Sequence, residues 1–136
     1  MSEVFLCRGE RVHFSNGATE SLFECWKRLA QEDAGRPGMA AVAACLRERL
    51  ANYGDGCRSF GMDPEFLPDE LAGPNESAAL LAVVERTVAD PTLVPEVNWS
   101  PELLAWWRRQ LARMAEALRD SRVDQAEPGA TAQGGT

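Results

Sequence analysis

The sequence NWSPELLAWWRRQLARMAEALRD, residues 98–120, decides the fold. A helix is predicted to start near its beginning, because Ser100 is a good N-cap residue and proline is favoured at the first helical position, here Pro101. Apolar residues then recur at alternating spacings of three and four, which places them on one stripe of a helix. They are Leu104, Trp107, Leu111, Met114 and Leu118. The stretch therefore predicts a helix of roughly five turns with one face in the core.

Trp106 widens the apolar surface of this helix, because it lies about 100° around the helix axis from Trp107. One interpretation is that the helix is wedged between two other elements and that Trp106 belongs to the core. The other is that Trp106 is an exposed anchor for a partner, since tryptophan is enriched at binding hot spots. The sequence leaves both interpretations open.

Upstream of this helix, the pattern of residues 3–15 predicts a β-hairpin with its turn at Gly9-Glu10. Apolar spacing predicts three further helices, over about 19–33, 39–52 and 76–90. The intervening residues 53–74 lack this spacing and are rich in glycine and proline, which is typical of a loop. The aromatic and leucine side chains of this loop predict that it is packed down and ordered.

The predicted fold class is α+β, mostly α. It has an N-terminal β-hairpin packed on about four helices, with a long ordered loop between helices 2 and 3. The predicted domain organisation is a single globular domain over residues 1–120, followed by a disordered C-terminal tail over 121–136, where the apolar spacing ends.

Charge is unevenly distributed along the chain. With 14 basic and 21 acidic residues the net charge is −7, so nucleic acid is not expected as a partner, because phosphate binding needs a basic surface. Ten acidic and two basic residues fall between positions 55 and 102, and this stretch alone carries −8. These residues are either solvated loop and helix-start charges or an acidic patch that attracts a basic protein.

Catalytic and metal-binding patterns are missing from the sequence. The single histidine, His13, excludes paired-histidine sites, and the four cysteines do not have C-x-x-C spacing. We therefore expect no enzyme activity, no catalytic residues, no cofactor and no metal. A signal-peptide pattern is missing, and no window reaches the ~18 apolar residues of a membrane span. A cytoplasmic protein with free thiols and no membrane partner is expected.

In its small size, acidity and lack of catalytic motifs, the chain resembles bacterial immunity proteins as a class. This resemblance implies a protein-binding inhibitor of immunity or antitoxin type, which caps a basic toxin or nuclease with an acidic surface. The expected partner-binding residues are Asp63, Glu65, Asp69, Glu70, Phe60, Phe66 and Trp106. Two alternatives remain: a non-catalytic adaptor or subunit that uses Trp106, and a small-molecule-binding protein with its pocket under the 54–74 loop.

Overall fold

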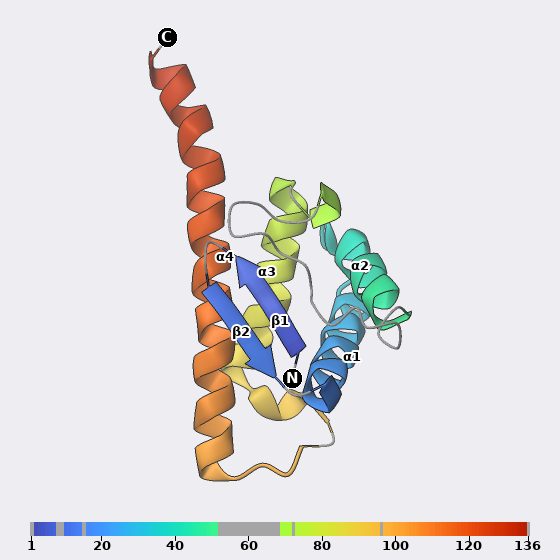
Figure 1. The fold of residues 1–136 in the computed structure, drawn as a ribbon. Helices are drawn as coiled ribbons and strands as arrows, with labels where there is room; N and C mark the ends of the chain where they lie inside the picture. Colours follow the sequence, from blue (N-terminus) through green and yellow to red (C-terminus); the bar gives the residue numbers. More distant parts are fainter. Residues whose placement is uncertain are drawn as a thin grey trace.

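The structure, a computed structural model, describes the backbone at residues 2–7, 10–14, 16–51, 69–71, 73–95 and 97–135. It describes the side chains at residues 14, 17–51, 70–71, 73–95 and 97–120. Four helices dominate it (Figure 1): α1 (Asn16–Glu32), α2 (Met39–Ala51), α3 (Pro74–Ala89) and α4 (Pro101–Gly135). Two short 3-10 helices flank α3: η2 (Asp69–Leu71) and η3 (Pro91–Leu93).

The predicted α+β class is wrong. The structure is mostly helical, with 82% helix in four helices, so a β-hairpin packed on the helices is not supported. Ahead of α1, the backbone trace follows two short paired extended segments, β1 (Ser2–Cys7) and β2 (Glu10–Phe14). Only Phe14 among them has a described side chain. Alternation over so short a stretch was weak evidence, because an isolated pair of strands is at best marginally stable, whereas the four helices supply most of the buried core here.

The start of α4 confirms the predicted cap. The Ser100 hydroxyl accepts a hydrogen bond from the Leu103 amide at 3.1 Å, and the Ser100 carbonyl accepts one from the Leu104 amide at 2.8 Å. Trp107 and the three later members of the predicted stripe are buried, while Leu104 is half-buried. The helix does not end near residue 120 but continues to Gly135. No side chain after position 120 is described, so the proposed division into a domain and a tail stays a prediction.

Removing the cap tests this account of the α4 start. Substituting alanine for Ser100 is expected to lower the free energy of unfolding by about 1 kcal/mol, because one first-turn amide loses its acceptor. Ser100→Asp, which keeps an acceptor and adds negative charge at the positive end of the helix, serves as the control and should leave stability nearly unchanged. Urea unfolding measures both changes. Equal stability of the alanine variant and the native protein would contradict the capping role.

The helices pair as α1 with α2 and α3 with α4, and the core lies between the pairs (Figure 1). The inner face of α1 consists of Leu22, Cys25, Trp26 and Leu29, which are all buried. The Trp26 indole N–H is satisfied inside the core, donating to the Thr87 hydroxyl of α3 at 3.2 Å. This bond joins α1 to α3 across the core.

The turn between α1 and α2 brings α2 close to the start of α3. Gly38 has a φ of 84°, a backbone conformation that glycine adopts readily and other residues rarely. A Cβ atom placed on it would lie 2.5 Å from the Asn75 carbonyl carbon and oxygen and 2.6 Å from the Glu76 nitrogen. The close approach of the α1–α2 turn to the first turn of α3 therefore requires glycine at position 38.

Within the described ranges, none of the helices combines the length and apolar character needed to cross a membrane.

Candidate functional site

The predicted acidic site falls largely outside the residues that the structure describes. Phe60, Asp63, Glu65 and Phe66 all lie in the undescribed stretch 52–68. Asp69 begins η2, and its side chain is not described. Glu70 is exposed, and its carboxylate accepts a weak hydrogen bond from the Cys45 thiol at 3.7 Å. The structure therefore does not bring the predicted acidic residues together, and their joint role stays a prediction.

The described cysteines are structural in character. Cys25 and Cys45 are buried and free. Burial raises the pKa of the Cys45 thiol to about 11, and burial raises the pKa of Cys25 as well. Because the thiolate is the reactive form, both thiols are poor nucleophiles at neutral pH.

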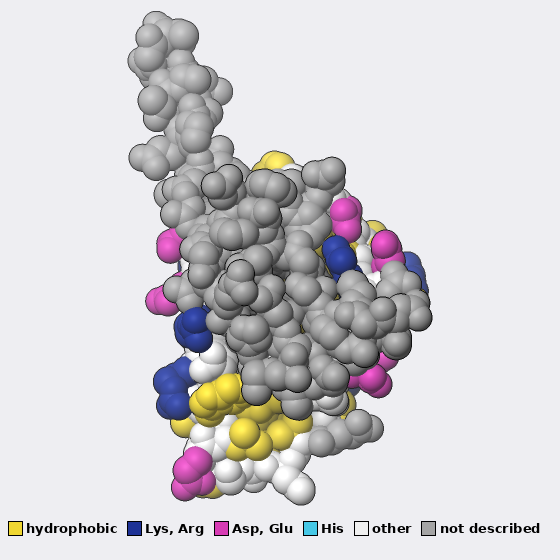
Figure 2. All heavy atoms as spheres, viewed as in Figure 1, with side chains coloured by type: hydrophobic (Ala, Val, Ile, Leu, Met, Phe, Trp, Pro, Cys, Tyr) yellow, Lys and Arg dark blue, Asp and Glu magenta, His cyan; other side chains and the backbone are white. Residues whose placement is uncertain are grey.

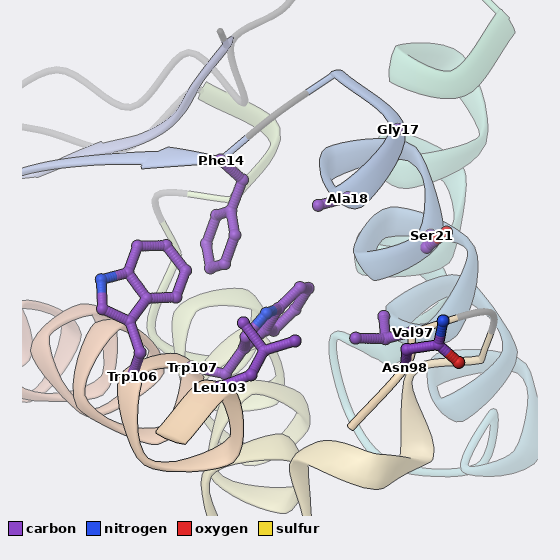
Figure 3. Close-up of a pocket in the computed structure, with 9 residues that line it drawn as sticks. All are labelled: Phe14, Gly17, Ala18, Ser21, Val97, Asn98, Leu103, Trp106 and Trp107. Atoms are coloured by element: carbon purple, nitrogen blue, oxygen red, sulfur yellow. The ribbon is translucent and has the colours of Figure 1, made fainter. Parts of the chain in front are cut away.

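The described residues form a pocket between the start of α1 and the start of α4 (Figure 3). Its volume is about 500 Å³. Nine residues from four segments line it: Phe14, Gly17, Ala18, Ser21, Val97, Asn98, Leu103, Trp106 and Trp107. The site is thus assembled from residues that lie far apart in the sequence.

Aromatic rings make one wall of this pocket, which we call the α1–α4 pocket. Phe14 meets Trp106 edge to face, with ring centroids 5.2 Å apart and an interplanar angle of 83°. The same phenyl ring lies 4.5 Å from the Trp107 ring, which in turn contacts Trp99 at 5.3 Å. Such arrangements are favourable for aromatic pairs, so the wall is a fixed surface rather than a set of separate side chains.

The two neighbouring tryptophans have different roles. Trp107 is only 2% exposed and belongs to the core, as its place on the apolar stripe predicts. Trp106 packs against the core but stays half-buried at the edge of the pocket. The wide apolar face of α4 therefore serves two purposes: Trp107 packs inside the core, and both tryptophans line the pocket, with Trp106 at its more exposed edge.

The opposite side of the pocket carries its hydroxyl and amide side chains. Figure 3 shows the Ser21 hydroxyl and the Asn98 amide at the end away from Phe14 and Trp106. Ser21 is half-buried and Asn98 is exposed. Neither side chain has a hydrogen-bond partner among the described residues. Both groups are therefore available to a ligand, and both are uncharged.

Small side chains on α1 create the space. Gly17, Ala18 and Ser21 fall on one side of the first turns of the helix, since positions separated by three or four residues lie on the same face. Gly17 has no heavy atom within 4 Å of the position that a Cβ would take. This run of small residues, opposite Leu103 and the tryptophans of α4, is the sequence signal by which the pocket could have been predicted.

The described residues that line the pocket are all uncharged, and two arginines of α4 bind α3 instead. Figure 2 shows a hydrophobic patch on the lower part of the molecule, with basic side chains beside it. The Arg108 guanidinium donates hydrogen bonds to two carbonyls at the end of α3, that of Val88 at 3.1 Å and that of Ala89 at 3.4 Å. Farther along α4, Arg119 pairs with Glu85 at 2.9 Å. Among the described residues, no three acidic, cysteine or histidine side chains lie close enough together to hold a metal ion.

Comparison of the chain with protein-family models, curated proteins and solved structures yields no match.

Proposed function

We propose that the protein is a non-catalytic binding protein that holds a small, largely apolar molecule in the α1–α4 pocket. The observation that carries this proposal is the pocket itself, with its volume of about 500 Å³ and its aromatic wall. Small-molecule sites commonly occupy about 300–1,000 Å³ and combine apolar walls with a few placed polar groups. The proposal follows the small-molecule alternative from the sequence, but it places the pocket between α1 and α4 instead of under the 54–74 loop.

The lining supports binding in preference to chemistry. None of the nine residues around the pocket is acidic, basic, histidine or cysteine. General acid–base catalysis needs a side chain that can exchange a proton near neutral pH, and nucleophilic catalysis needs an activated nucleophile. Ser21 has no described base beside it, so its hydroxyl is suited to hydrogen bonding.

Filling the pocket tests the proposal. Indole and butylbenzene, as first probes, are expected to raise the melting temperature of the native protein, because a ligand that binds only the folded state stabilises it. At a concentration one hundred times the dissociation constant the gain is about 2.7 kcal/mol, or roughly 10 °C for a domain of this size. Ala18→Phe places a ring in the pocket and should abolish this rise without unfolding the protein.

Ala44→Phe is the matched control for this experiment, because Ala44 is an exposed alanine on α2, away from the pocket. This variant should respond to the probes like the native protein. Equal thermal responses of the Ala18 and Ala44 variants would contradict binding in the α1–α4 pocket. A native protein whose melting temperature did not change with either probe would also contradict binding in this pocket.

An immunity-type inhibitor remains a second proposal, supported by the charge of −8 between positions 55 and 102 and by the exposure of Glu70. It requires a basic partner that is retained at low salt and released at moderate salt, because salt screens exposed charges. Neutralising Asp63, Glu65, Asp69 and Glu70 together should remove this partner. Retention of the partner by the neutralised variant would contradict the acidic-patch hypothesis. An adaptor would instead hold its partner at both salt concentrations and lose it on Trp106→Ala.

A further inference from the structure

The α1–α4 pocket has two chemically different ends. Phe14 and Trp106 stand at one end, and Ser21 and Asn98 stand at the other (Figure 3). The aromatic end offers ring faces and edges, to which another ring or a branched apolar group packs well. The polar end offers a hydroxyl, which both donates and accepts hydrogen bonds, and a primary amide, which has separate donor and acceptor atoms.

The polar end is also uncharged. Among the described residues, no acidic or basic side chain lines the pocket, so a charged head group placed there would lose part of its hydration without gaining an opposite charge from them. A neutral group that both donates and accepts hydrogen bonds loses less hydration and finds both kinds of partner in Asn98. The chemistry of the lining therefore selects for an uncharged head group.

From this division we infer that the pocket takes an uncharged amphipathic molecule with an aromatic or branched apolar body and one neutral hydrogen-bonding head. The body packs against Phe14 and Trp106, and the head meets Asn98 and Ser21. This inference rests on the proposed binding function and deepens it, since it states the ligand class and its orientation.

Three probes with one skeleton separate the contributions of shape and charge. They are 3-phenylpropanamide, which is neutral, 3-phenylpropanoate, which is negative, and 3-phenylpropylammonium, which is positive. The native protein is expected to bind the amide about tenfold more tightly than either ion, since an unpaired charge is costly to desolvate. Isothermal titration calorimetry measures the three dissociation constants.

A charge introduced at Asn98 tests the orientation of the ligand. Asn98→Asp keeps the side-chain shape and adds a carboxylate where the head group is placed. It should tighten binding of the ammonium probe by about fivefold and weaken binding of the propanoate probe by a similar factor. Because Asn98 is exposed and has no described partner, the substitution should leave the fold intact. Asn75→Asp, at an exposed asparagine of α3, is the matched control and should leave all three affinities unchanged.

The outcomes distinguish this inference from the proposed function. A preference for the amide together with the ammonium gain in Asn98→Asp supports the inference. If all three probes bind equally, or if the Asn98 and Asn75 variants behave alike, the inference is wrong while the pocket remains a binding site. Tightest binding of propanoate by the native protein overturns the neutral head group. If neither these probes nor butylbenzene bind, both the inference and the proposed function fail.

Discussion

Substituting alanine for Gly38 is expected to lower the free energy of unfolding by about 3 kcal/mol. The φ of 84° places the residue in the left-handed region, which costs a residue with a Cβ atom about 1–2 kcal/mol. The new methyl group would also lie 2.5 Å from the backbone carbonyl of Asn75. Backbone atoms cannot rotate away as a side chain can, so α2 and α3 must move apart, and packing between them is lost as well.

Gly35→Ala is the matched control, because Gly35 lies in the same turn with nothing within 4 Å of its Cβ position. This variant should be unchanged or slightly more stable, since alanine restricts the unfolded chain. Urea unfolding of both variants gives the comparison. A Gly38 variant as stable as the Gly35 variant would show that α2 and α3 do not approach each other as the structure has them.

Alanine in place of Trp107 is expected to cost about 3–5 kcal/mol, the range for truncating a buried large side chain. Trp107 is 2% exposed and contacts both Phe14 and Trp99, so its removal leaves a cavity between α4 and the segments beside it. The loss should appear in urea unfolding as a lower midpoint with an unchanged slope.

Trp106→Ala provides the comparison at the neighbouring position. Because Trp106 is half-buried, its removal should cost clearly less stability than removal of Trp107. It should weaken butylbenzene binding, since it removes part of the aromatic wall. If the two variants lost equal stability and only Trp107→Ala lost binding, the roles assigned to the two tryptophans would be reversed.

The helical part of the fold could be predicted because its signals are local. The 3-4 spacing in residues 98–120 gave the buried face of α4, and a serine followed by a proline gave its start, both of which the structure confirms. The buried face of α1 followed from the same kind of spacing. These patterns express the helix period itself, which a single sequence carries in full.

The fold class was predicted less accurately than the helices. Alternating residues near the N-terminus suggested a hairpin, but short alternation carries little information beside four helices that form most of the core. The disordered tail predicted from the loss of apolar spacing after residue 120 stays a prediction, although the backbone of α4 is helical to Gly135. A helix can continue without an apolar stripe where no other element covers it.

The α1–α4 pocket was missed for a different reason. It depends on Phe14, the first turns of α1 and residues 97–98 meeting beside α4, and no local pattern encodes this arrangement. The composition of residues 53–74 drew attention to the acidic loop instead, because glycine, proline and carboxylates are visible in sequence. The ambiguity over Trp106 was real, since the structure gives it both contact with the core and a place in the pocket wall.

Titration of the ¹⁵N-labelled protein with butylbenzene tests binding in the α1–α4 pocket most directly. The chain has four tryptophans, so its ¹H–¹⁵N spectrum contains four indole signals, which single Trp→Phe variants assign. The signals of Trp106 and Trp107 should move with a common saturation curve. The Trp26 signal should stay in place, because its N–H is bonded to Thr87 inside the core. A spectrum in which all four signals stay unchanged, or in which Trp26 moves as far as Trp106, would contradict a binding site between α1 and α4.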